Sequence, residues 1–263
     1  MIRPRTPRRE ELGAFLAARR RAAPRQAAGL PPTGRRVHTG LSREEVATLA
    51  GVSASWYTWL EQGRDINVSR QVLAAVARVL RLSSAEADYV YGLAEREDVA
   101  PVIRRERIPD HLQRLIDAFD FPAFVVTADW AILGWNAGYA WLYPRIAELA
   151  PADRNLLQLV YTDPYLREML PDWERDSRRF LAEFRSQAGV RLAGPGHRAV
   201  IDRLTEASAD FRAHSAELEV QRFASRRRVF RHRDEGLVEF EHHLLTPSDA
   251  ADLSVVMYVP LAR

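Results

Sequence analysis

The chain has 263 residues, of which 47% are hydrophobic and 28% charged. These proportions are typical of a globular protein and exclude a disordered or fibrous chain. The absence of cysteine excludes disulfides, thiolate nucleophiles and cysteine-ligated metals, and it fits a cytoplasmic location. No run of about 18 apolar residues is present, and the first residues lack the apolar core of a signal peptide, so we expect neither a membrane partner nor export.

Charge is distributed unevenly along the chain. All 38 basic residues are arginine, and the net charge is +3. Residues 1–43 contain 11 arginines and 2 acidic residues, whereas residues 101–263 contain 22 arginines and 24 acidic residues. A basic N-terminal segment joined to a near-neutral remainder predicts a polyanion-binding module attached to a second domain. The alternative is that the arginines simply form a solvated surface. The sequence motifs distinguish these two interpretations.

A short helix is predicted to begin after Ser42, because Ser42 and Glu45 have the spacing of a capping box. Gly51 stands where a left-handed residue would end this helix. The expected inward face is formed by Val46, Leu49 and Ala50. A sharp turn should follow, leading into a second helix.

The second helix is predicted from Ser53, which can cap it, and from Tyr57 and Leu60, which fall three residues apart on its inward side. Ala47 is small enough for a close crossing of the two helices. Two short helices joined by a glycine turn form a helix-turn-helix, which favours DNA binding over a plain helical hairpin.

The outward positions of the second helix are the candidate base contacts, namely Ala54, Ser55, Thr58 and Trp59. None of these side chains makes a bidentate contact, so DNA shape or a dimer that reads two half-sites should contribute to specificity. Arg43 and Arg64 flank the motif as candidate phosphate contacts, with a solvated surface as the alternative for each. Arg35 and Arg36, in a predicted loop over residues 24–40, could also follow the phosphate backbone.

Residues 35–86, from RRVHTGLSREEVATLAGVS to LRLSSAE, closely resemble the N-terminal domain of MmyB-like transcriptional regulators, a subgroup of the XRE (Cro/C1-like) helix-turn-helix superfamily. The match extends over about residues 8–95, although Ser42 and Thr39 replace the Arg and Pro of many relatives. The resemblance implies a compact five-helix domain that binds double-stranded DNA. The hydrophobic periodicity agrees, with helices predicted at 8–21, 42–50, 54–62, 69–80 and 84–95.

The rest of the chain mixes helix and strand patterns. We expect a linker at 96–108, a helix at 109–119, two short strands around Ala128 and Asp129, and helices at 154–161, 171–188, 195–206 and 208–215. Strands are then predicted at 226–233, 236–246 and 253–260. This order indicates an α+β domain over residues 109–263, after a helical domain over residues 1–95.

The same family resemblance extends over this half, through the segments WAILGWN (130–136), RNLLQLVYTDP (154–164), PDWE (171–174), FRH (230–232) and SVVMYV (254–259). It implies a PAS-like domain that encloses an apolar cavity, for which fatty-acid-like ligands have been proposed. It therefore implies a small hydrophobic ligand, and we expect a homodimer whose arrangement that ligand shifts.

The residues themselves suggest how such a ligand would be held. Apolar contacts are expected from Trp135, Leu157 and Tyr161, and oriented polar groups from Asn136, Arg154 and Asn155. Three alternatives stay open: the aromatic residues belong to the core, Asn136 caps the next helix, or Arg154 pairs with Asp153 or Asp163.

Catalysis is disfavoured, because no metal, phosphate-loop or serine-hydrolase motif is present. We therefore expect no catalytic residue, no metal and no cofactor beyond a bound hydrophobic molecule. Two other functions remain as alternatives. The second domain could serve only dimerisation or docking, or it could be an enzyme that uses carboxylates such as Asp129, Asp163, Glu239 and Glu241.

Overall fold

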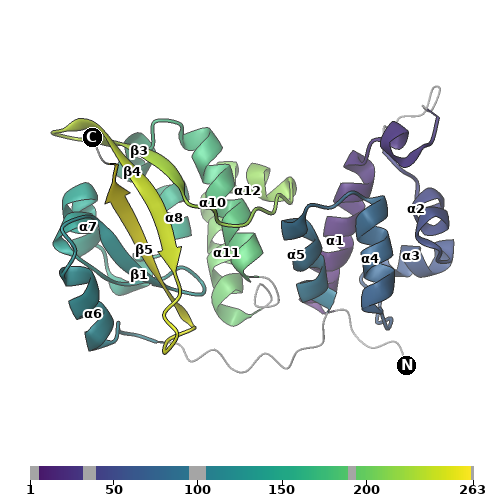
Figure 1. Cartoon of the computed structure of the whole chain (residues 1–263), viewed down its shortest axis with the longest axis horizontal. Coiled ribbons are helices and arrows are strands. Elements are labelled where there is room, and N and C mark those ends of the chain that lie inside the picture. The colour runs from purple at the N-terminus through teal and green to yellow at the C-terminus, as the bar shows by residue number, and fades with distance from the viewer. Residues whose placement is uncertain (1–5, 32–39, 95–104, 189–193, 262–263) are drawn as a thin grey trace. The chain divides into compact units, whose positions relative to one another are not determined.

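The computed structural model describes residues 6–31, 40–94, 105–188 and 194–261. The helices up to Ala94 form one compact unit, and the elements from Asp110 onward form a second (Figure 1). Arg35, Arg36 and most of the predicted linker at 96–108 lie outside the described residues. No described helix is long and apolar enough to cross a bilayer.

The N-terminal unit is helical. Its elements are α1 (Pro7–Ala22), the short 3-10 helix η1 (Arg25–Ala28), α2 (Arg43–Ala50), α3 (Ala54–Glu61), α4 (Arg70–Val79) and α5 (Ser84–Ala94). The five helices predicted from the sequence are confirmed, each to within one residue at its ends; η1 was not predicted. Serine caps explain these starts, because the side chains of Ser42, Ser53 and Ser69 each accept a hydrogen bond from the backbone N–H three residues later.

Tight contacts hold the helix-turn-helix in place. The predicted capping box of Ser42 and Glu45 is present, and Gly51 ends α2 with a left-handed φ of 71°. At Gly13 of α1, a Cβ atom would lie 2.3 Å from the backbone oxygen of Glu61, so only glycine permits the observed approach of α1 to α3. The expectation for Leu49 was wrong: it is 44% exposed, because α2 turns that side away from the core.

The C-terminal unit contains helices and one sheet. Its helices are α6 (Asp110–Asp117), α7 (Ala137–Leu142), α8 (Leu156–Thr162), α9 (Pro164–Met169), α10 (Trp173–Ala188), α11 (Pro195–Ala207) and α12 (Ala209–Ala216), and its strands are β1 (Ala123–Thr127), β2 (Ile132–Trp135), β3 (Arg226–His232), β4 (Gly236–Leu245) and β5 (Leu253–Pro260). The α+β domain is confirmed. The short helix α9 and the 3-10 helices η2 (Pro144–Ala147) and η3 (Pro151–Asp153) were not predicted, because each is too short to show a helical period. A helix after Asn136, where α7 begins, entered only through the alternative in which Asn136 caps it.

All five strands form one antiparallel sheet in the order β2-β1-β5-β4-β3. The register pairs Arg226 with His242 and Arg228 with Phe240, and it pairs His242 with Tyr258. Because side chains alternate along a strand, all five of these side chains point to the same face of the sheet.

The two faces of the sheet are covered differently. On one face, Leu112 and Ile116 of α6 pack in one cluster with Ala123 and Val125 of β1. On the opposite face lies α10, whose Phe180 ring stacks on a side chain of β3. Helices α10, α11 and α12 lie side by side next to the sheet within this unit (Figure 1).

Candidate nucleic-acid interface and ligand-binding residues

The start of α3 is open to solvent. The four residues predicted to contact bases lie on its outer side: Ala54, Ser55 and Trp59 are exposed, and Thr58 is half-buried. The opposite side is anchored by Tyr57 and Leu60, which are 0% and 3% exposed. A helix held on one side and open at its N-terminal end has the geometry needed to enter a major groove.

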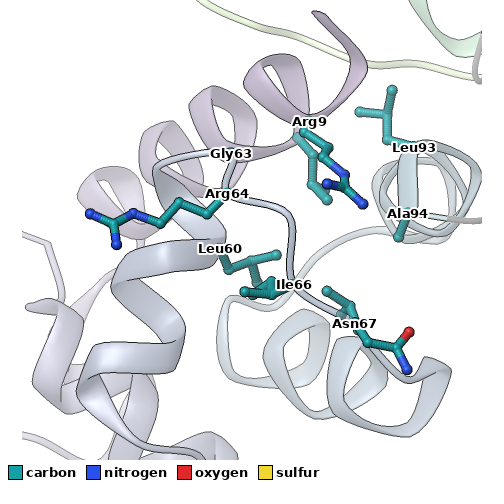
Figure 2. A pocket seen from close by; sticks show the side chains of 10 residues that line it. Arg9, Leu60, Gly63, Arg64, Ile66, Asn67, Leu93 and Ala94 are labelled. Carbon is teal, nitrogen blue, oxygen red and sulfur yellow. The ribbon is translucent and has the colours of Figure 1, made fainter. Parts of the chain in front are cut away.

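Arg64 follows α3 and also faces outward. Its guanidinium lies 5.7 Å from the ring centroid of Trp59, so the two exposed side chains form one cation–π pair. Figure 2 shows Arg64 pointing away from Arg9 and from the small pocket lined by both residues. That pocket has a volume of about 50 Å³, which holds only a few water molecules. The Arg64 side chain is therefore directed outward, where a phosphate could reach it.

Arg43 has a partner within the protein. Its Nε donates to Glu61 Oε2 at 2.6 Å, while Arg20 Nε donates to Glu61 Oε1 at 2.6 Å. The Glu61 side chain is 1% exposed and that of Arg43 is 43% exposed. Burial opposes ionisation of Glu61, but the hydrogen bonds from Arg20 and Arg43 outweigh it and lower the pKa of this carboxyl below its usual value. Arg43 thus links α2 to α3 through this ion pair, and part of its side chain remains exposed to solvent.

Sequence reasoning missed Arg20 and Glu61. Their separation of 41 residues leaves no periodic or motif signal. The one clue is Glu61 itself, an acid at the end of an otherwise uncharged helix, where the helix dipole disfavours negative charge.

Asn136 is fully engaged by the protein. Its Oδ1 accepts hydrogen bonds from the backbone N–H groups of Ala123 and Tyr139, at 3.0 and 2.9 Å. Its Nδ2 lies within hydrogen-bonding distance of three carbonyl oxygens, those of Ile116, Phe119 and Phe121. Asn136 therefore caps α7, which was the alternative left open, and also joins α6 to β1.

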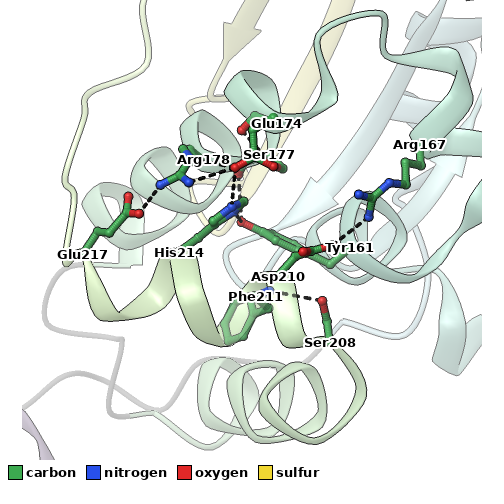
Figure 3. A network of polar contacts seen from close by, with 10 residues as sticks. All are labelled: Tyr161, Arg167, Glu174, Ser177, Arg178, Ser208, Asp210, Phe211, His214 and Glu217. Atoms are coloured by element: carbon green, nitrogen blue, oxygen red, sulfur yellow. Dashed lines mark hydrogen bonds and ion pairs between the residues drawn. The ribbon is translucent and has the colours of Figure 1, made fainter.

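Asn155 and Tyr161 are likewise bonded internally. Asn155 caps α8 through Gln158 N and donates to the carbonyl oxygen of Asp129 at 2.7 Å. Tyr161 points toward Ser177 and His214 (Figure 3), donating to the Ser177 carbonyl at 3.1 Å and lying 3.0 Å from His214 Nδ1. Burial raises the pKa of the Tyr161 hydroxyl further above physiological pH, so the hydroxyl keeps the proton that it donates.

The remaining predicted ligand residues differ in burial. Leu157 is 0% exposed and belongs to the core. The guanidinium of Arg154 stacks on Trp135 at 4.9 Å from the ring centroid, and its Nε is buried without a hydrogen bond among the described residues. The two acids that were the alternative partners of Arg154 pair with other arginines, Asp153 with Arg203 and Asp163 with Arg145. The structure thus brings Trp135 and Arg154 together.

A polar cluster lies on the face of the sheet that packs against α10, the inner face, and it was not predicted. It contains Arg226 and Arg228 of β3, His242 of β4, and Asp176 and Glu183 of α10, of which Arg228 is 2% and Glu183 1% exposed. The alternation of RRRVFRH was the available signal, because it places residues 226 and 228 on the same face as Phe230.

A separate open groove of about 370 Å³ lies beside α8 and α11. Its lining includes Gln158, Leu159, Thr162, Arg203 and Leu204. None of the six predicted ligand residues lines this groove.

Comparison with known proteins identifies both parts of the chain. Residues 108–263 match the family model of the MmyB-like transcription regulator ligand binding domain, and residues 11–90 match a helix-turn-helix domain. No curated protein matches the chain. Both matched domains are those of a DNA-binding transcription regulator with a ligand-binding domain, and the first covers more than half of the chain. The chain therefore belongs to the family of MmyB-like transcription regulators.

Proposed function

We propose that this protein is a sequence-specific regulator whose α3 reads the major groove of an operator. The observation that carries the proposal is the exposed N-terminal end of α3, with Ser55 and Thr58 on its open side and Tyr57 fixed beneath. Hydroxyl groups suit several bases, and Trp59 offers an apolar contact to a thymine methyl or a sugar. Arg43 and Arg64 would then contact phosphates on either side.

Selection from a pool of random duplexes tests this part of the proposal. The full chain should enrich one short sequence, and a labelled duplex carrying it should bind far more tightly than a scrambled one of equal length. Equal binding of both duplexes across a range of salt concentrations would show that attraction to phosphates is the whole interaction.

We further propose that the C-terminal unit binds a small hydrophobic, fatty-acid-like molecule. The family description as a ligand-binding domain supports this, as do the aromatic side chains gathered on the inner face of the sheet. Mass spectrometry of an extract from the purified protein should detect a stoichiometric lipid-like molecule, or the protein emptied of it should bind a medium-chain fatty acid. A protein that carries and binds none would instead be assigned the docking alternative.

In the proposed mechanism the ligand favours one arrangement of a homodimer, and only that arrangement matches the spacing of two half-sites. Dimeric binding fits the absence of a bidentate base contact on α3, because one weakly discriminating helix gains specificity from a second copy. Sedimentation with and without ligand measures the dimer, and duplexes with altered half-site spacing measure the coupling. A ligand that changes neither sedimentation nor the preferred spacing would contradict this mechanism.

A further inference from the structure

A buried arginine lies at the centre of the polar cluster in the C-terminal unit. Arg228 is 2% exposed, and its guanidinium lies 4.3 Å from the ring centroid of Phe180. A charge taken out of water is costly unless it is both paired and hydrogen-bonded. The partners of this guanidinium therefore decide what the site is for.

The protein does not supply those partners in full. Arg228 Nη1 lies 3.5 Å from Asp176 Oδ1, too far for a good hydrogen bond, and none of the three guanidinium nitrogens has a hydrogen-bond partner among the described residues. Arg226 Nη2 lies 2.5 Å from Glu183 Oε1 without hydrogen-bond geometry, and Arg226 Nε also has no partner. Five buried donor nitrogens thus face two carboxylates, those of Asp176 and Glu183, neither of which accepts a hydrogen bond from them. The two carboxylates balance the charge of the two arginines, but they leave the hydrogen-bond donors of the cluster unmet.

His242 does not satisfy these donors. Burial, followed by the positive charges of Arg228 and Arg226, lowers the pKa of His242 well below its usual value, so the imidazole is neutral. Its Nδ1 is buried without a hydrogen bond, so at most one further acceptor is present. The unmet donors therefore favour an acceptor group that comes from outside the chain.

Aromatic side chains surround the cluster. Besides Phe180, the ring of Phe223 lies 5.9 Å from the Arg226 guanidinium and packs edge-on against His242. Tyr258 packs against His242 and against Phe230. A molecule whose polar group met the two arginines would thus place its remainder among apolar rings.

We propose that Arg228 and Arg226 bind the carboxylate of an amphipathic small molecule whose apolar part packs against these rings. The inference rests on the proposed function, in which the C-terminal unit binds a ligand, and it assigns the residues and the charged group. A planar carboxylate accepts two parallel hydrogen bonds from one guanidinium fork. The Arg226 side chain is 17% exposed, so the carboxylate would reach the buried Arg228 past Arg226 and Phe223.

Calorimetric titration of the full chain with two matched amphiphiles tests the assignment. Dodecanoate and dodecanol share a chain length and differ in the charged group; both are used below the concentration at which they aggregate. Wild-type protein should bind dodecanoate roughly 10- to 100-fold more tightly, because hydrogen bonds to charged groups add that much. Equal affinity for the two would overturn the assignment, and this comparison needs no variant.

Variants on one strand locate the effect. Arg228→Gln should abolish the preference for dodecanoate and leave the affinity for dodecanol unchanged, and Arg228→Lys, which keeps the charge without the fork, should be intermediate. Arg227→Gln is the matched control, because the Arg227 side chain is 61% exposed, pairs with Glu239 and points to the other face. A wild-type preference that survives Arg228→Gln, or is lost in Arg227→Gln, would overturn the assignment.

The two levels of the proposal fail in different ways. If dodecanol binds as well as dodecanoate, the apolar ligand of the proposed function stands and only the arginine site is wrong. If neither amphiphile binds, both are wrong. Duplex selection with the same preparation reports on DNA binding independently of either result.

Discussion

Arg43, the first residue of α2, donates a hydrogen bond at 2.6 Å to Glu61, the last residue of α3. The same carboxylate accepts a hydrogen bond from Arg20 of α1, so one buried acid joins three helices of the N-terminal unit. This network lies at the C-terminal end of α3, away from the exposed end proposed to meet DNA. It therefore sets the direction of the recognition helix without occupying its reading surface.

Replacing this acid should destabilise the N-terminal unit. We expect Glu61→Gln to lower the free energy of unfolding by about 3 kcal/mol, because it leaves Arg20 and Arg43 without their counter-charge. Urea titration measures the change. Glu10→Gln, at an exposed position of α1, is the control and should change stability by less than about 1 kcal/mol. A loss of similar size in both variants would contradict the network's role.

The same network predicts a pH dependence. The pKa of Glu61 is lower in the folded chain than its usual value, so the unfolded chain binds more protons in this range. The stabilisation is complete above the usual carboxyl pKa and is lost as the pH falls through the folded one. Unfolding curves at neutral and acidic pH should show this loss in wild type and less of it in Glu61→Gln. Identical pH profiles of the wild-type protein and Glu61→Gln would rule out Glu61 as the source of this loss of stability.

Substitution of Arg43 and of Arg64 should distinguish the loss of a DNA contact from the loss of folding stability. Arg43→Ala and Arg64→Ala should each weaken binding to all duplexes equally and reduce the salt slope by roughly 1. Only Arg43→Ala should also lower the free energy of unfolding, by up to about 1 kcal/mol, because the Arg43–Glu61 pair is partly exposed. Fluorescence anisotropy across salt concentrations, with thermal unfolding beside it, measures both effects. An unchanged salt slope in both variants would remove the phosphate assignment.

The reading surface itself is tested at Thr58. Thr58→Ala should change the sequence that duplex selection enriches, because Thr58 is only half-buried on the side of α3 that also carries the exposed Ser55 and Trp59. Thr48→Ala, at an exposed position of α2, is the matched control and should leave the preference unchanged. An unaltered preference in Thr58→Ala would count against placing this face in the groove.

Asn136 gives a prediction for the C-terminal unit. Asn136→Ala should lower the free energy of unfolding by roughly 3 kcal/mol or more, because the backbone N–H groups of Ala123 and Tyr139 and several carbonyls lose their partner. Asn67→Ala, at an exposed position, should have little effect. Thermal unfolding of the full chain distinguishes the two. A small loss in Asn136→Ala would mean that these groups find other partners.

Local signals determined much of this protein from the sequence. Capping residues such as Ser42 and Ser53 act within three positions along the chain, and Gly51 acts at a single φ, so they mark helix ends wherever the chain folds. Alternation similarly located β3, β4 and β5, because side-chain direction in a strand depends only on position. The helix-turn-helix and its outward residues follow from such local rules.

Tertiary structure alone decided which polar groups meet. Glu61 finds Arg20 across 41 residues, and Arg228 of β3 meets Phe180 of α10 through the packing of that helix against the sheet. Asn136 looks like an ordinary helix cap in the sequence, and its contacts with Ile116 and Phe121 arise from the packing of α6. Burial strengthens a hydrogen bond between two such distant residues and makes a donor without a partner costly. Burial depends on how the whole chain packs, so no single segment of the sequence reveals it.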